Sequence, residues 1–192
     1  MAQPVGISQS TDGRFARPQY AVEGLKCGAY RAEVKTMPDA MPHPSQSEWH
    51  IWFDGSAYPN PGRIGLGVLV VSPGGQRQEY SGVAAQGGCN NVAELLALGK
   101  ALDMARASGA RHVLLQGDSD FVVRHINGLD TTKVIRLREI ILHTQDLMTG
   151  FAECRLTWIP RHRNRDADRL SRAALGLPDK PGLHPGLLRR RR

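Results

Sequence analysis

The segment from Trp49 to Asp54 constrains the fold of this 192-residue chain more than any other. Its side chains alternate with a period of two, and Trp49, Ile51 and Phe53 share one side, which predicts a buried β-strand. The strand ends on Asp54, where a carboxylate is costly unless it is paired, hydrogen-bonded or bound to a metal. The alternative is ordinary turn chemistry, since the Asp-Gly-Ser and Pro-Asn-Pro-Gly sequences found here are common in loops.

Three later acids occupy similar positions, each at the end of a predicted element. Glu94 lies one turn before Leu98 on the buried face of a helix, although a capping box with Asn91 as N-cap also explains it. Asp118 follows a strand, where open α/β sheets bind ligands, or it caps the next helix. Asp168 lies in the first turn of the last helix, where an acid also suits the helix dipole.

The hydrophobic periodicity predicts an α/β fold with a mixed five-stranded sheet and helices on both faces. The predicted strands cover residues 49–54, 64–71, 76–84, 112–116 and 154–159, and the predicted helices cover residues 91–108, 121–127, 132–148 and 166–175. Short connections predict that the first three strands form an antiparallel meander with the third at an edge. A strand–turn–helix unit follows, which predicts that the fourth strand is parallel to the first.

Two of these elements carry further expectations about packing. The two glycines of the second strand, Gly65 and Gly67, are expected to let another backbone or a ligand come close. The helix over 132–148 is expected to bury one apolar side. That side consists of Val134, Leu137, Ile141 and Met148.

The composition divides the chain into three parts. Residues 1–47 are rich in Pro, Gly, Ser and Gln without periodicity, which predicts a disordered N-terminal extension. Residues 48–177 form the predicted globular domain and have a net charge of only +2. Residues 178–192 form a predicted disordered basic tail in which five basic and one acidic side chain give +4. Net charge is therefore weak support for a nucleic-acid partner of the domain itself.

The three cysteines, Cys27, Cys89 and Cys154, lie far apart in the sequence and are odd in number. Free thiols in a reducing compartment are the simplest interpretation, and we expect a cytoplasmic protein. The sequence contains no run of 18 apolar residues, so no membrane span is expected. No signal peptide is evident at the N-terminus.

In the predicted topology, Asp54 and Asp118 end neighbouring strands, while Glu94 and Asp168 begin helices that pack on the sheet. Four carboxylates at one place repel each other strongly unless cations lie between them. Ligands that are all oxygen suit Mg²⁺ or Mn²⁺ and not zinc. The sequence therefore predicts a site for two metal ions about 3.5–4 Å apart, of the kind used in phosphoryl chemistry.

Four segments in this order resemble the motifs of the type 1 ribonuclease H family. They are Phe-Asp-Gly-Ser-Ala-Tyr-Pro-Asn-Pro-Gly at 53–62, Asn-Asn-Val-Ala-Glu-Leu at 90–95, Gly-Asp-Ser-Asp at 117–120, and Pro-Arg-His-Arg-Asn-Arg-Asp-Ala-Asp at 160–168. Each segment is a weak signal alone, but the four together cover essentially all of 48–177 and are highly specific. The resemblance implies the ribonuclease H-like fold.

The resemblance also implies an activity, namely endonucleolytic cleavage of the RNA strand of RNA–DNA hybrids. In the family the four matched acids, here Asp54, Glu94, Asp118 and Asp168, bind two metal ions. One ion activates a water and the other stabilises the leaving 3′ oxygen, so the products carry 5′-phosphate and 3′-hydroxyl ends. We expect Mg²⁺, with Mn²⁺ as a substitute, and a monomer that has no membrane partner.

By the same resemblance, several residues are expected to contact the nucleic acid. Glu94 and the backbone at Gly55 and Ser56 are placed to recognise 2′-hydroxyl groups, which distinguish RNA from DNA. The polar contacts to the strands are expected from Asn60, Asn90 and Asn91, with Cys89 where many members have Thr, and from Arg161 and His162 of the basic turn.

The chain departs from the family pattern at three places. Asp120 replaces a frequent Gln, and either assists metal binding or is simply solvated, which we favour. The glycine-rich histidine loop near the last acid is cut to 161–163, so His162 either assists product release or contacts a phosphate. The segment between residues 127 and 132 is short, so the basic handle of some members is absent. The alternatives are another nuclease of this fold and a non-catalytic nucleic-acid-binding module.

The basic tail generates a prediction. Because the domain is only mildly basic, Arg189–Arg192 are expected to supply affinity that the missing handle would otherwise give. Truncation after Leu177 should then lower the slope of log K against log salt for hybrid binding by up to about 3, with turnover at saturating substrate unchanged. Binding measured at several salt concentrations tests this, and an unchanged slope and affinity would show that the tail lies outside the binding surface.

Overall fold

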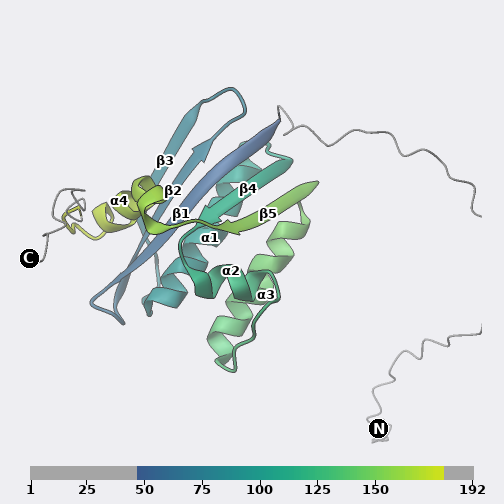
Figure 1. The fold of residues 1–192 in the computed structure, drawn as a ribbon. Helices are drawn as coiled ribbons and strands as arrows, with labels where there is room; N and C mark the ends of the chain where they lie inside the picture. Colours follow the sequence, from purple (N-terminus) through teal and green to yellow (C-terminus); the bar gives the residue numbers. More distant parts are fainter. Residues whose placement is uncertain (1–46, 180–192) are drawn as a thin grey trace, which may run out of the picture. The chain divides into compact units, whose positions relative to one another are not determined.

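The structure is a computed structural model that describes residues 47–179 (Figure 1). Residues 1–46 of the predicted N-terminal extension and Arg189–Arg192 of the tail lie outside the described residues. The strands are β1 (Glu48–Tyr58), β2 (Arg63–Val71), β3 (Arg77–Val83), β4 (His112–Gly117) and β5 (Glu153–Trp158). The helices are α1 (Asn90–Ala107), α2 (Asp120–Ile126), α3 (Ile135–Thr149) and α4 (Arg165–Ala173), with a 3₁₀ turn at Arg161–Arg163.

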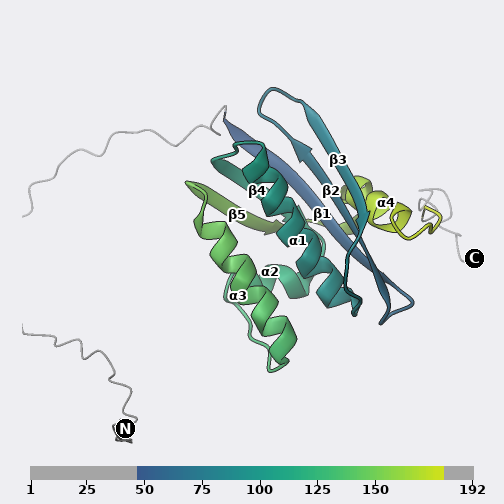
Figure 2. The same cartoon turned by 180° about the vertical axis from the view of Figure 1, so that it is seen from behind.

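The five strands form one sheet in the order β3-β2-β1-β4-β5. The pairs β1–β2 and β2–β3 are antiparallel, while β1–β4 and β4–β5 are parallel. The mixed five-stranded sheet predicted from the sequence is therefore confirmed, including the parallel fourth strand and the third strand at an edge. The sheet has helices on both faces: α1 and α3 cover one and α4 the other (Figures 1 and 2).

The central strand β1 is longer than predicted. It pairs with β4 only over Glu48–Trp52, but with β2 it pairs as far as Tyr58. The expectation that the strand ends at Asp54 is therefore wrong, as is the alternative that Asp54-Gly-Ser begins a turn. Because β2 continues to offer backbone partners, β1 runs on after its parallel neighbour has ended, and Asp54 lies just beyond the parallel ladder.

Helix α1 packs closely on β1. Its predicted apolar stripe, from Leu98 to Ala105, is buried together with Ile51 and Phe53 of the strand. Gly55 is essential to this contact, because a methyl group added there would overlap the α1 backbone at Ala93 and Glu94. The glycine therefore lets the first turn of α1 reach the middle of β1.

Helix α4 approaches the opposite face equally closely. A methyl group added at Gly65 would overlap the carbonyl of Ser171, and one at Gly67 would overlap the carbonyl of Ala167. The prediction that these glycines admit another backbone is confirmed, and the backbone is that of α4. The sheet is thus approached by helix backbones from both sides at its centre.

Helix α3 begins later than predicted. It starts at Ile135, and its N-cap residue Val134 is extended, with its N–H donated to the Thr132 hydroxyl at 3.2 Å. Val134 therefore does not belong to the buried side and is 55% exposed, whereas Leu137 and Ile141 are buried as predicted. The Thr132 hydroxyl binds the Val134 N–H in a local, non-helical hydrogen bond, and this delays the start of the helix. Sequence periodicity does not reveal such a bond.

Two of the three cysteines lie among the described residues. Cys89 and Cys154 are free thiols, while Cys27 lies outside the described residues. Burial raises the pKa of the Cys154 thiol to about 11, so it stays protonated near neutral pH. Within residues 47–179, none of the helices has the length and apolarity that a membrane crossing requires.

The end of the described chain is tied to α4. The Arg172 guanidinium donates two hydrogen bonds to the Pro178 carbonyl, at 3.0 and 2.7 Å. The predicted domain boundary at 177/178 cuts through this contact. Truncation of the tail is therefore better placed after Asp179, so that the contact is kept.

The close approach of α4 yields a stability prediction. Gly67→Ala should destabilise the protein by about 1–3 kcal/mol, because the added methyl group forces α4 away from β2. Gly99→Ala is the matched control, since Gly99 lies in α1 with open space around its Cβ position and should stabilise by about 0.5–1 kcal/mol. Denaturant unfolding measures both, and equal stability of the two variants would contradict the packing described here.

Candidate active site

Three of the four predicted acids converge next to β1. Asp54 comes from β1, Glu94 from α1 just after its first turn, and Asp118 follows β4. Each offers one carboxylate oxygen, and these three oxygens lie within 4.8 Å of one another. Because β4 stops where β1 continues, the end of one strand and the middle of the next present their side chains to the same place.

Glu94 is held by the strand and not by its own helix. The Gly55 N–H donates to Glu94 Oε2 at 3.3 Å. The N-cap of α1 is Cys89, which makes no side-chain capping bond, so the predicted capping box with Asn91 is wrong. The close contact at Gly55 brings α1 so near to β1 that the Gly55 N–H binds the Glu94 carboxylate. Glu94 therefore binds the strand and does not cap α1.

Asp118 is fixed at two of its atoms. Its Oδ1 accepts a hydrogen bond of 2.6 Å from the Asn164 side-chain amide, and its backbone carbonyl accepts one of 3.1 Å from the Trp158 indole. The cap of α2 is Ser119, whose hydroxyl accepts from the Val122 N–H at 3.4 Å, so the alternative role of Asp118 as that cap is excluded.

Asn164 connects α4 to the centre of the site. It is 1% exposed, and its amide also donates to the Phe53 carbonyl at 2.9 Å. Its Oδ1 is buried and has no hydrogen-bond partner among the described residues. Asn164 is the N-cap residue of α4 by position, but its side chain binds β1 and Asp118 and makes no capping hydrogen bond.

The fourth predicted acid, Asp168, lies outside this three-acid group. It is 9% exposed on α4, and its Oδ1 accepts from the Arg161 guanidinium at 3.2 Å. Burial lowers the pKa of Arg161, but the hydrogen bond and charge of Asp168 and the charges of Asp118 and Asp54 raise it more. Arg161 was predicted to contact nucleic acid, and here it is the counterion of the acidic side chains.

The repulsion within the three-acid group exceeds what the nearby Arg161 offsets at Glu94. Burial, together with the charges of Asp54 and then Asp118, raises the pKa of Glu94 well above its ordinary value. The Gly55 N–H and Arg161 act in the opposite direction but do not offset this. Hard divalent cations take carboxylate oxygens as ligands, and a cation between these acids would remove the repulsion. The donor set therefore fits the predicted metal site.

A cavity of about 350 Å³ opens onto the acids. Its walls include four of the predicted nucleic-acid contacts, namely Gly55, Ser56, Asn90 and Arg161, together with Arg172 and Leu177 near the end of α4. The other four predicted contacts, Asn60, Cys89, Asn91 and His162, do not line it. Asp120 is exposed at the start of α2 and lies outside the three-acid group, as the solvated alternative expects.

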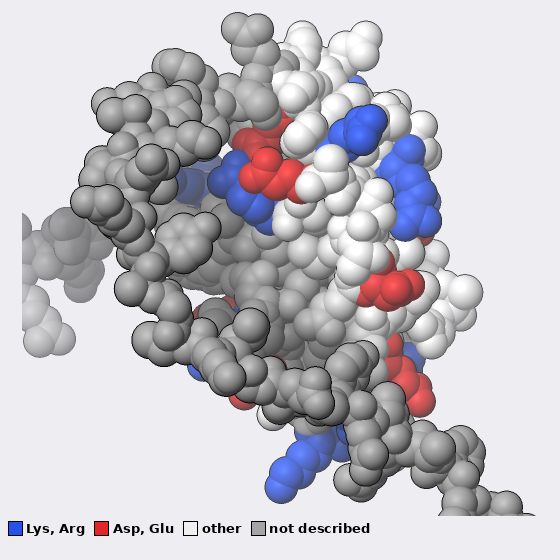
Figure 3. Space-filling model, turned by 90° about the vertical axis from the view of Figure 1, so that its right-hand side faces the viewer, with Lys and Arg blue, Asp and Glu red and all other residues white. Residues whose placement is uncertain are grey.

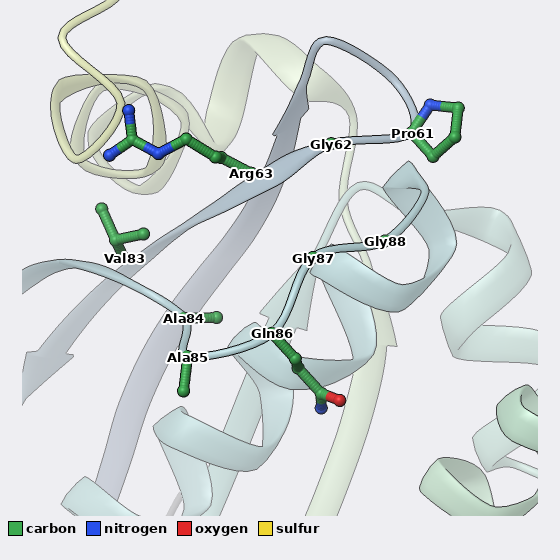
Figure 4. Close-up of a pocket in the computed structure, with 9 residues that line it drawn as sticks. All are labelled: Pro61, Gly62, Arg63, Val83, Ala84, Ala85, Gln86, Gly87 and Gly88. Carbon is green, nitrogen blue, oxygen red and sulfur yellow. The ribbon is translucent and has the colours of Figure 1, made fainter.

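The two asparagines at the rim brace the protein itself. The Asn60 side chain accepts from the Asn90 N–H, and the Asn90 side chain accepts from the Ala57 N–H, both at 3.2 Å. Next to them, Gly62 and Gly88 exchange two backbone hydrogen bonds of 2.9 Å. A second hollow of about 570 Å³ lies beside this bridge (Figure 4) and holds none of the acids. These contacts tie the β1–β2 turn to the start of α1.

Charge on the described surface is mixed. In Figure 3 basic and acidic side chains are interspersed among uncharged residues. The ion pairs that cross from β3 to α4, Arg77 with Asp166 and Arg169 with Glu79, both at 2.9 Å, follow the same pattern. On this face, side chains of both signs therefore lie among one another.

Three functional candidates escaped the sequence analysis: Asn164, Trp158 and Ser171. Ser171 lies on α4 and donates to Asp54 Oδ2. Asn164 lies two residues before the predicted helix over 166–175, which indicates its position but not its hydrogen-bond partners. Trp158 and Ser171 gave no signal, because their partners are more than 35 residues away in sequence.

Comparison with known proteins agrees with this architecture. Residues 52–174 match the family model described as "Reverse transcriptase-like". A curated relative, ribonuclease HI of Halobacterium salinarum, is 36% identical over 132 residues, which are 66% of this chain and 63% of the relative. The chain thus spans less than two thirds of that relative's length.

Solved structures give the same result. The RNase H1 structure from Halobacterium salinarum is 34% identical to this chain, with a TM-score of 0.65. The match covers 67% of this chain and 98% of that one. LC11-RNase H1, solved in complex with an RNA/DNA hybrid, is 29% identical with a TM-score of 0.61, covering 67% and 96%. The sheet order and the acids on its central strands define a ribonuclease H-like fold. Within that class, the chain belongs to the type 1 ribonuclease H family.

The charge on Glu94 yields a pH prediction. Since its pKa is raised in the folded protein, its ionisation destabilises the fold, and wild type should lose stability relative to Glu94→Gln as pH rises above about 4.3. Below that pH the two proteins should be equally stable. Thermal unfolding without metal measures this, and Mg²⁺ should stabilise wild type more than the variant. Glu139→Gln, which changes an exposed acid, is the control. A stability difference between wild type and Glu94→Gln that stays constant across pH would contradict the repulsion.

Proposed function

We propose that this protein is a metal-dependent endoribonuclease that cleaves the RNA strand of RNA–DNA hybrids and leaves 5′-phosphate and 3′-hydroxyl ends. The observation that carries the proposal is the group of three carboxylate oxygens within 4.8 Å in a polar cavity. Membership in the type 1 ribonuclease H family supports the reaction, and the hybrid bound to the similar LC11-RNase H1 supports the substrate.

The proposed metal ligands are Asp54, Glu94 and Asp118, with Asp168 as a fourth acid beside them. Divalent cations bound there would supply an activated water and stabilise the leaving oxygen. The protein contributes a rigid set of ligands, since the Gly55 amide holds Glu94 and the Asn164 amide holds Asp118. Such fixed hydrogen bonds preserve the geometry that a transition state requires.

The Arg161–Asp168 ion pair has a proposed role in this scheme. A guanidinium 3.2 Å from Asp168 neutralises that acid and faces the same cavity as the three-acid group. A phosphate that enters the cavity would be a second partner for Arg161, which carries several donors. Gly55, Ser56 and Asn90 on the same wall are the proposed contacts to the nucleic acid, and Asn60, Cys89, Asn91 and His162 are proposed from the motif match.

Several finer points stay predictions from the sequence. They are the choice of Mg²⁺ with Mn²⁺ as a substitute, the use of two ions, the monomeric state and the cytoplasmic location. The domain limits at 48 and 177 also stay predictions.

The test compares labelled RNA–DNA hybrid, double-stranded RNA and double-stranded DNA with and without Mg²⁺. We expect cleavage of the hybrid RNA strand only, and only with the metal. Asp54→Asn and Asp118→Asn should each lower turnover at least about 100-fold, because each removes a charged ligand that the reaction requires. Asp103→Asn, an exposed acid on α1, is the control and should behave as wild type.

Three results would contradict the proposal. Near-wild-type turnover in either variant would remove the assigned acids from the reaction. Equal rates on hybrid and double-stranded DNA would favour another nuclease of this fold. Hybrid binding without any cleavage would favour a non-catalytic binding module.

A further inference from the structure

A serine on α4 reaches the acid at the centre of the site. Ser171 is 0% exposed and lies three residues after Asp168. Its Oγ is bonded to Asp54 Oδ2, and lies 2.8 Å from Ser56 Oγ and 3.0 Å from the Asp168 carbonyl oxygen. One buried hydroxyl therefore connects α4 with two residues of β1.

The number of hydrogens decides the direction of these bonds. The Ser171 hydroxyl has one hydrogen to donate, while a carboxylate only accepts. A bond to a charged oxygen is stronger than one to a carbonyl, so the Ser171 hydrogen goes to Asp54. Ser56 then donates to Ser171 Oγ at 2.8 Å in preference to Asp54 Oδ2 at 3.5 Å. The result is an ordered chain from Ser56 through Ser171 to Asp54.

The packing keeps Ser171 in this position. Gly65 of β2 leaves no room even for a methyl group against the Ser171 carbonyl, so α4 lies as close to the sheet as a backbone can. Asp54 is itself 4% exposed, and a bond to one of its oxygens fixes how the carboxylate is rotated. A carboxylate held in this way is set in its ligand orientation before a cation arrives.

We propose that Ser171 is a positioning residue that presets the Asp54 carboxylate for divalent cation binding, with Ser56 orienting the Ser171 hydroxyl. This inference rests on the proposed metal-dependent function and deepens it. It assigns part of the metal affinity to a helix that contributes no member of the three-acid group. The role is to orient a ligand, so it concerns metal affinity more than substrate affinity.

The experiment measures Mg²⁺ binding to the full chain by calorimetry without substrate, and the Mg²⁺ concentration for half-maximal hybrid cleavage. Ser171→Ala should weaken Mg²⁺ binding about 10-fold, in line with the loss of a hydrogen bond to a metal ligand. The KM for hybrid at saturating Mg²⁺ should stay within twofold of wild type. Ser171→Cys keeps a weak donor of similar size and should fall between the two.

The matched control is Ser81→Ala. The Ser81 hydroxyl donates to the Leu170 carbonyl of the same helix at 2.8 Å, but it comes from the edge strand β3 and touches none of the acids. A purely structural effect of losing a hydroxyl contact with α4 would appear in both alanine variants. Thermal unfolding in the presence of a chelator verifies that each variant is folded. If Ser171→Ala does not fold, Ser171→Cys is used for the test instead.

The outcomes separate this inference from the proposed function. Weaker Mg²⁺ binding in the Ser171 variants alone, with hybrid KM unchanged, supports the positioning role. Mg²⁺ affinity equal to wild type in a folded Ser171 variant overturns it, while hybrid cleavage by wild type leaves the proposed function standing. Failure of wild type both to bind Mg²⁺ and to cleave hybrid overturns the proposed function and this inference with it.

Discussion

The structure depends on the close approach of two helix backbones to the middle of β1 and β2. Three glycines permit it, since Gly55 admits α1 on one face while Gly65 and Gly67 admit α4 on the other. A side chain at any of these positions would separate a helix from the sheet. The acidic residues of the site come from the sheet and from both helices, so the same contacts that complete the core also determine the distances between the carboxylates.

This arrangement has an electrostatic cost that is itself informative. Asp54, Glu94 and Asp118 repel one another, and the pKa of Glu94 is raised by burial and by its two neighbours. A fold selected only for stability would place an apolar side chain there, since like charges at short range are unfavourable. Neutral and cationic groups instead hold the acids in place: the Asn164 amide, the Gly55 N–H and the Arg161 guanidinium. Preserving charge at some expense of stability is characteristic of a site that binds cations.

The hydrogen bonds around the acids form an ordered support. Asp54, Glu94 and Asp118 each have a partner from a distant part of the chain, namely Ser171, Gly55 and Asn164, and these partners are buried. Ser171 and Asn164 both belong to the α4 region and act on different acids, so this one helical segment steadies Asp54 and Asp118 together. Family membership alone does not reveal this support, because it depends on contacts that span more than 40 residues.

The sequence by itself determined the sheet, the order of its elements and the candidate acids. Alternating apolar residues such as Ile51 and Phe53, and glycines such as Gly67, report local burial, which periodicity can detect. The tertiary structure alone decided that β1 continues through Asp54, that Glu94 is bound by Gly55 and caps nothing, and that Asp168 pairs with Arg161. It also decided the partners of Asn164, Trp158 and Ser171. Sequence periodicity records which face of an element a residue occupies, whereas hydrogen-bond partners are chosen by how separate elements pack, and no local pattern encodes that choice.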